Sequence, residues 1–124
     1  MKILACDDNA FLTKIIQLKV ANENLGTVDV AANGKECIRM MDKEKFDLLL
    51  LDIHMPFNSG FELLTYVRNQ LKLATPIIVL SSESLSTTVR KARELGANDF
   101  MAKPFNPAEL ILRIKQLMKK YEYA

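Results

Sequence analysis

The chain has 124 residues, 49% of them hydrophobic and 26% charged, which predicts one compact domain that buries a core without metals or disulfides. It contains no apolar run long enough to cross a membrane and no signal peptide, so we expect a soluble protein of the cytoplasm. Lysine and arginine number 17 against 15 aspartates and glutamates, and a formal charge of +2 is too small to predict direct binding of nucleic acid.

Two cysteines, Cys6 and Cys37, lie far apart in the sequence among apolar residues. Two are too few for a disulfide framework, and their spacing is unlike that of a zinc site. We therefore expect both to be buried as small hydrophobic side chains.

Short apolar runs alternate with longer stretches of helical period along the chain. Strands are expected at residues 2–6, 28–31, 47–51, 77–80 and 99–102. The third of these is apolar on both faces, which is typical of a central parallel strand with helices on two sides. Strands that alternate with helices through short connections predict an α/β fold with a doubly wound parallel sheet.

The first two helices have clear start signals. Asn9 can cap the first, and Asn33-Gly34 is a turn signal that opens the second. The inward stripe of the first helix is expected to contain Phe11, Ile15 and Leu18, with Leu12 and Ile16 beside it. The second is expected to turn inward Cys37, Ile38 and Met41.

The later helices also combine an apolar stripe with start or stop signals. A loop over residues 53–60, which carries Pro56, leads to a helix whose stripe is Phe61, Leu64 and Val67. The fourth helix has an apolar stripe of Val89, Ala92 and Leu95 and stops at Gly96. The last can begin with Asn106 as its cap, Pro107 in the first position and Glu109 completing a capping box. Its buried stripe is expected to be Leu110, Ile114, Leu117 and Tyr121.

Four of the expected strands end in polar residues that belong to one rim. In an open parallel sheet the functional site lies beyond the carboxyl ends of the strands. The residues there are Asp7 and Asp8 after the first strand, Asp52 after the third, Ser81 after the fourth and Lys103 after the fifth.

Three carboxylates in one small site repel one another unless a cation neutralises them. Oxygen ligands favour Mg²⁺, which typically takes one or two carboxylates together with a phosphate oxygen. An aspartate can act as a nucleophile toward phosphorus, and a lysine and a hydroxyl can hold the remaining phosphoryl oxygens. The rim therefore predicts Mg²⁺-dependent transfer of a phosphoryl group onto Asp52.

Over nearly its whole length, the chain resembles the receiver domains of two-component response regulators. The residues that carry the resemblance are Asp7-Asp8, Asp52 followed by Met55-Pro56 and Gly60, Ser81 after an apolar strand, and Lys103-Pro104-Phe105 after Gly96-Ala97. The resemblance implies a single flavodoxin-like (βα)5 receiver domain over residues 1–124, with strand order 2-1-3-4-5.

The resemblance also implies roles for individual residues. Asp52 would be the phosphoacceptor and Lys103 would pair with phosphoryl oxygens, next to a cis bond between Lys103 and Pro104. Mg²⁺ would be held by Asp8, Asp52 and the backbone carbonyl of His54, with Asp7 reaching it through water. Ser81 would be the hydroxyl switch and Phe100 the aromatic switch, acting by packing alone because it lacks a hydroxyl.

The family further suggests that His54 and Glu83, two residues past the acceptor and two past the hydroxyl, gate the water that attacks the acyl phosphate. Their opposite charge potential predicts an interaction across the site and a dephosphorylation rate that changes with pH near neutrality.

The partners implied by the resemblance are a histidine kinase or a histidine phosphotransferase and a downstream target. The target would read the surface of the fourth helix, fifth strand and last helix, and phosphorylation could also drive homodimerisation. Basic residues on this surface are Arg90, Lys91, Arg93, Arg113, Lys115 and Lys119. The domain would be either a stand-alone switch or a receiver excised from a longer regulator with an output domain.

Three functional classes are weighed. The first is a signalling protein that catalyses only its own phosphorylation and dephosphorylation. The second is a phosphohydrolase of the haloacid-dehalogenase type, which is opposed by His54 at the position of its general acid and by an acceptor on the third strand. The third is a flavodoxin-like mononucleotide carrier, for which no glycine-rich phosphate loop is present.

Overall fold

Five parallel strands form the centre of the computed structural model, which describes residues 1–55 and 59–122. The strands are β1 (Lys2–Cys6), β2 (Thr27–Ala31), β3 (Leu48–Asp52), β4 (Ile77–Ser81) and β5 (Asp99–Ala102). They are ordered β2-β1-β3-β4-β5, the order expected from the resemblance. The flavodoxin-like doubly wound architecture is therefore confirmed.

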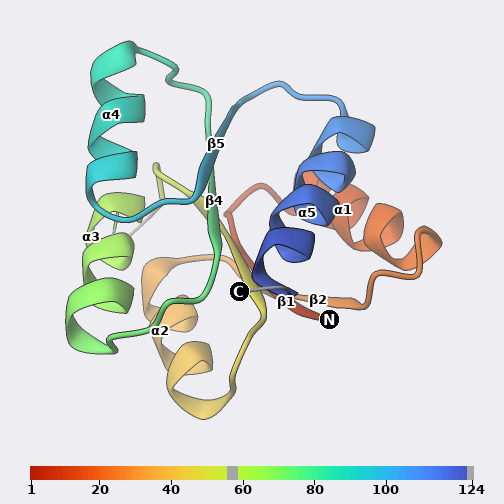
Figure 1. Ribbon diagram of the computed structural model, residues 1–124, viewed down its shortest axis with the longest axis horizontal. Helices are drawn as coiled ribbons and strands as arrows, with labels where there is room; N and C mark the ends of the chain where they lie inside the picture. Colours follow the sequence, from red (N-terminus) through yellow and green to blue (C-terminus); the bar gives the residue numbers. More distant parts are fainter. Residues whose placement is uncertain (56–58, 123–124) are drawn as a thin grey trace.

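Helices cover both faces of the sheet. They are α1 (Ala10–Asn22), α2 (Gly34–Lys43), α3 (Gly60–Thr65), which continues as the π-helical turn η1 (Tyr66–Gln70), α4 (Ser86–Glu94) and α5 (Pro107–Glu122). Figure 1 shows α1 and α5 on one face and α2, α3 and α4 on the other. None of the helices within the described residues is both long and apolar enough to cross a membrane.

The leucines of β3 explain why this strand lies in the middle. Leu48 and Leu50 pack into the core under α1 and α5, whereas Leu49 and Leu51 pack into the core under α2, α3 and α4. All four are at most 1% exposed. Burial of one such side chain contributes about 1.5–3 kcal/mol, so a strand apolar on both faces is most stable between two helical layers.

Asparagine and serine side chains start the helices. As expected, Asn9 accepts a hydrogen bond from a backbone N–H of the first turn of α1, and Asn106 accepts one from Ala108. Asn33, which the sequence indicated only as part of a turn, accepts one at the start of α2. A complete capping box is present only at α3 among the described helices, where Ser59 and Glu62 satisfy each other's backbone. This box starts α3 soon after the strand that ends at Asp52.

The box expected at the last helix is not observed, because the Glu109 carboxylate accepts a hydrogen bond from Arg113 instead. The stripe of α5 also differs from the expected one. Ile111 is buried, whereas Tyr121 is only half-buried and its hydroxyl accepts a hydrogen bond from Asn98. Pro56, expected in the loop before α3, lies outside the described residues.

The expected inward stripe of α1 is wrong. Phe11 is 78% exposed and Leu18 54% exposed, and the buried residues of the helix are Thr13, Ile16 and Val20. α1 is apolar on more than one side, so its period did not decide which side packs against the sheet. Thr13 can be buried because its hydroxyl donates to the Ala10 carbonyl, 3.1 Å away.

Cys6 of β1 and Cys37 of α2 are fully buried, as expected. They are not separate small side chains, however, because their sulfurs form a disulfide between Cα atoms that lie 6.1 Å apart. The two cysteines are separated by 31 in sequence, and local sequence does not show that α2 packs over the carboxyl end of β1.

Candidate functional site

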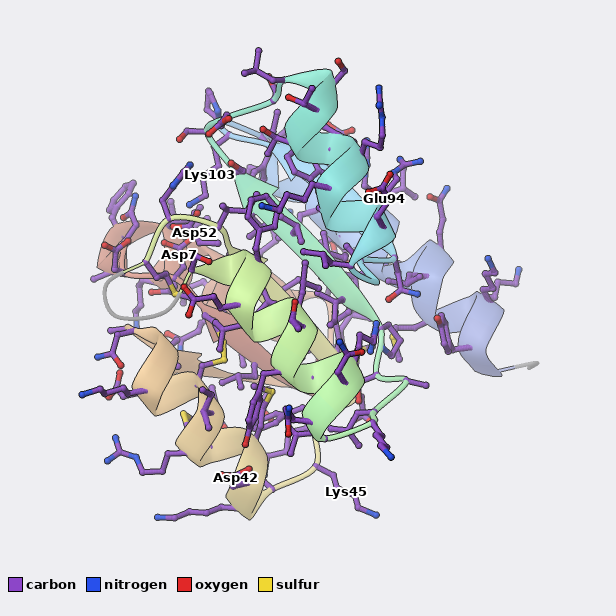
Figure 2. All side chains as sticks on the ribbon, turned by 90° about the vertical axis from the view of Figure 1, so that its left-hand side faces the viewer. Asp7, Asp42, Lys45, Asp52, Glu94 and Lys103 are labelled. Carbon is purple, nitrogen blue, oxygen red and sulfur yellow. A yellow bond between two sulfur atoms is a disulfide. The ribbon has the colours of Figure 1, made fainter. Side chains whose placement is uncertain are left out.

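The polar residues that follow four strands meet at one edge of the sheet, as the parallel arrangement requires. Asp52 and Ser81 are the last residues of β3 and β4, and Asp7, Asp8 and Lys103 follow the ends of β1 and β5. Figure 2 shows Asp7, Asp52 and Lys103 together at this edge, whereas Asp42 and Lys45 lie at the opposite end of the molecule.

The three aspartates form a cluster whose carboxylate oxygens lie within 4.8 Å of one another. Asp7 is 2% exposed and Asp52 is 5% exposed, whereas Asp8 opens to solvent. Burial raises the pKa of Asp52 above its usual value; the nearby lysine lowers it and the neighbouring carboxylates raise it further. A buried acidic cluster of this kind is stabilised by a cation, and its oxygen-only donors fit a hard divalent ion such as Mg²⁺.

Lys103 supplies positive charge on the far side of the cluster. Its Nζ lies 2.7 Å from Asp7 Oδ2 and 3.7 Å from Asp52 Oδ1, and its side chain is largely buried. The peptide bond between Lys103 and Pro104 is cis, and the Lys103 backbone N–H donates to the Ser81 carbonyl, 2.7 Å away. The lysine is thus held beside β4 with its ammonium close to Asp52.

The two expected switch residues are both buried. The Ser81 Oγ accepts a hydrogen bond from the Glu83 backbone N–H, 3.0 Å away, so the hydroxyl is engaged by its own loop. Phe100 of β5 is 8% exposed and packs in the core under α4, together with Val79 and Ala92. Since phenylalanine has no hydroxyl, this residue makes only apolar contacts there.

His54 and Glu83 lie on the loops that follow β3 and β4, two residues after Asp52 and Ser81 respectively. The interaction expected between them is present, with His54 Nε2 3.3 Å from Glu83 Oε2. The His54 backbone N–H donates to Asp52 Oδ1, 3.3 Å away. The imidazole and the carboxylate therefore bridge the two loops next to Asp52, and both are partly exposed to solvent.

Gly60 has a structural role at the site. In the sequence it stands out only as one of the residues that carry the resemblance. Its N–H donates to the Ile53 carbonyl, 2.9 Å away. A Cβ at this position would lie 2.6 Å from the Asp52 carbonyl oxygen and 2.7 Å from the Ile53 Cα. Only glycine lets α3 begin this close to the backbone that carries Asp52.

Sequence reasoning missed Thr88 altogether. Its Oγ1 donates to Glu83 Oε1, 2.8 Å away, from the first turns of α4. Nothing in the sequence singles out this threonine, because Thr87 precedes it and serines surround it. Only the packing of α4 shows which of the two threonines faces the site.

Comparison with known proteins gives one consistent family. The family model described as response regulator receiver domain matches residues 3–115. The transcriptional regulatory protein ResD of Bacillus subtilis is 36% identical over 119 residues, which cover 96% of this chain and 48% of that protein. This chain thus spans about half the length of the curated relatives it matches.

Solved structures that resemble this chain are receiver domains as well. The BeF3-activated receiver domain of DrrB, a Thermotoga maritima protein, superposes with a TM-score of 0.85 at 31% identity, covering 95% of this chain and 97% of that one. A CheY-like receiver domain protein from Methanospirillum hungatei has a TM-score of 0.91 at 26% identity, covering 98% and 96% of the two chains.

Proposed function

Because this chain belongs to the response regulator receiver domain family, we propose that Asp52 accepts a phosphoryl group from the phosphohistidine of a histidine kinase or a histidine phosphotransferase. The observation that carries the proposal is the buried cluster of Asp7, Asp8 and Asp52, with the Lys103 ammonium beside it. Such a transfer is a step of a phosphorelay, and we place it in the cytoplasm by the resemblance, with residues 1–124 as one receiver domain.

The reaction exchanges one bond to phosphorus for another. The P–N bond of the donor's phosphohistidine breaks, and a bond forms between phosphorus and an Asp52 carboxylate oxygen. The three aspartates, with the backbone carbonyl of His54, would hold Mg²⁺, which when bound neutralises charge on the transferred group. Lys103 pairs with phosphoryl oxygens from the opposite side.

We assign the switch to Ser81 and Phe100. In the structure described here the Ser81 Oγ accepts from the Glu83 N–H, so its own hydroxyl hydrogen is free to donate to a phosphoryl oxygen. Turning toward Asp52 would release the Glu83 backbone and change the loop that leads into α4. Phe100 packs in the core under α4, where a shift of that helix changes its contacts.

The output surface we propose is that of α4, β5 and α5. Part of its basic charge is already paired: Arg113 contacts Asp99 at 3.0 Å and Lys115 contacts Glu23 at 3.5 Å. Within the part of the chain that the structure describes, Arg90 and Arg93 of α4 have no carboxylate partner. A downstream target, or a second copy of this domain, with acidic side chains would complement α4.

The phosphodonor has to bring its phosphohistidine to the aspartate edge, and α1 begins there, two residues after Asp8. Its outward stripe includes Phe11 and Leu18, which are both exposed. We propose that this stripe is the docking surface for the donor.

Intact mass after incubation with Mg²⁺ and acetyl phosphate tests the acceptor. Wild type is expected to gain one phosphoryl group, and Asp52→Asn is expected to gain none. Asp42→Asn is the matched control, because Asp42 lies at the opposite end of the molecule (Figure 2). A chelator should abolish the adduct, and an adduct on Asp52→Asn would refute the assignment.

The haloacid-dehalogenase alternative is not supported, since the family that matches residues 3–115 is the receiver domain. Both functions would lose donor turnover in Asp52→Asn, because both use a nucleophilic aspartate, so accumulation of the adduct is the measurement that separates them. We expect wild type to hold one phosphoryl group, whereas a hydrolase would turn over the donor many times with little adduct.

A further inference from the structure

Contacts between three side chains, those of Thr88, Glu83 and His54, connect α4 to the loop after β3. Thr88 Oγ1 donates to Glu83 Oε1 at 2.8 Å, and the other carboxylate oxygen of Glu83 lies 3.3 Å from His54 Nε2. His54 in turn donates its backbone N–H to Asp52. The Glu83 carboxylate therefore contacts α4 through one oxygen and the loop after β3 through the other.

Of these three residues, Thr88 is the one whose side chain is held in place. It is 8% exposed, lies within α4 (Ser86–Glu94), and is β-branched, so its χ1 angle is restricted in the helix. The side chains of His54 and Glu83 are 58% and 43% exposed. Ion pairs between exposed side chains are weak, partly because ordering both costs conformational entropy. Because the hydrogen bond from Thr88 holds Glu83 in one rotamer, part of that entropy cost is already met before His54 is contacted.

The contact between His54 and Glu83 lies next to Asp52, where it can restrict the access of water to that residue. His54 follows Asp52 on the loop after β3, and Glu83 lies on the loop after the neighbouring strand β4. Their side chains approach each other between these two loops, with His54 Nε2 3.3 Å from Glu83 Oε2. Water that hydrolyses a phosphorylated aspartate has to approach phosphorus from the side away from the carboxylate. The partly exposed side chains of His54 and Glu83 lie on the loops at this edge of the sheet.

We infer that Thr88 is a positioning residue that holds Glu83 against His54 and thereby lengthens the lifetime of phosphorylated Asp52. The inference rests on the proposed function and extends it to α4, the helix of the proposed output surface. A target that shifts the first turn of α4 would move Thr88 relative to Glu83 and would therefore also change the dephosphorylation rate.

The decay of the phosphorylated protein after removal of acetyl phosphate tests the inference. Thr88→Val keeps the shape of the side chain and removes the hydroxyl, and we expect decay about two- to fivefold faster, the range that coupling of an exposed ion pair allows. Thr88→Ser should restore the wild-type lifetime. Thr87→Val is the matched control, because Thr87 is its exposed neighbour. The rate of adduct formation should be unchanged in all three variants.

A double variant separates positioning by Thr88 from a general loosening of α4. In a Glu83→Ala background Thr88→Val is expected to add no further effect, because the carboxylate that it positions is gone. Decay that is unchanged or slower in Thr88→Val, or that accelerates equally in the Glu83→Ala background, would overturn the inference.

A second readout needs no phosphorylation. His54 is the one histidine of the chain, so its imidazole gives a single set of NMR signals. These signals should move in Thr88→Val and in Glu83→Ala at a fixed pH, and stay in place in Thr87→Val. If wild type forms no adduct, the proposed function fails while this readout still reports on positioning; an imidazole unmoved by Thr88→Val overturns the role of Thr88 in either case.

Discussion

At the scale of single residues, Asp52 shows the tension between stability and function. Its carboxylate is 5% exposed, next to two other aspartates, and burial raises its pKa. A group that holds its proton more tightly in the folded state than in the unfolded chain adds stability as the pH falls and costs stability when it is ionised. The charge that the proposed phosphoryl transfer needs is therefore a charge that the fold tolerates poorly.

Asp52→Asn should accordingly stabilise the metal-free protein. Removing the charge relieves repulsion and the cost of burying an ionised group, while the amide oxygen can still accept the His54 N–H, so we expect the free energy of unfolding to rise. Urea unfolding in the presence of a chelator measures it. Asp42→Asn, at an exposed position, should change little, and a loss of stability in Asp52→Asn would contradict this view.

Gly60→Ala should damage both stability and the site. The added methyl group would collide with the backbone of Asp52 and Ile53, which cannot move without shifting the end of β3. We expect a loss of about 1–3 kcal/mol, as for other overpacked positions, together with slower adduct formation from acetyl phosphate. A variant as stable and as reactive as wild type would show that the start of α3 moves freely relative to Asp52.

At the scale of elements, the exposed side of α1 is the proposed docking surface for the phosphodonor, and Phe11 lies on it. Phe11→Ala removes an exposed aromatic side chain and is expected to leave stability nearly unchanged. If α1 is the docking surface, this variant should slow phosphoryl transfer from a phosphorylated kinase or phosphotransferase severalfold. Transfer from acetyl phosphate should stay at the wild-type rate, because a small donor needs no docking.

Leu85→Ala is the matched control for α1, because Leu85 is 63% exposed but precedes α4 instead. Stopped-flow or gel-based transfer assays with both donors compare the two variants. Equal slowing with both donors in Phe11→Ala would point to a disturbed site and not to docking.

At the scale of the whole molecule, the Cys6–Cys37 bond links the central sheet to α2 across 31 positions of sequence. In the chain-entropy view, closing a loop of this length contributes about 3–4 kcal/mol by restricting the unfolded state. A reductant should therefore lower the free energy of unfolding of wild type by about that amount. Urea unfolding with and without reductant measures the difference.

The double variant Cys6→Ala/Cys37→Ala is the control for this measurement, since it should respond to no reductant. Disulfides are rare in cytosolic proteins, so the state of the pair inside cells depends on the compartment. Equal stability of wild type with and without reductant would show that the bond does not constrain the unfolded chain.

Much of this molecule follows from local sequence. The four leucines of β3, the alternation of strands and helices, and the asparagine caps are each set by neighbours a few residues apart, and they suffice for a parallel sheet. The parallel sheet then brings Asp7, Asp52, Ser81 and Lys103 to one edge, because every strand ends there. The location of the candidate site was thus predictable without any tertiary contact.

Other features depend on how elements pack, which local patterns do not contain. α1 is apolar on several sides, and only its fit against the sheet selected Thr13, Ile16 and Val20 as the inward residues. The pairing of Cys6 with Cys37 required α2 to cross the end of β1. The contact of Thr88 with Glu83 required a particular rotation of α4, which buries one threonine and exposes its neighbour. Sequence therefore determined the elements and the edge where the site lies, and the tertiary structure decided which faces meet, because helix orientation is set by packing between distant residues.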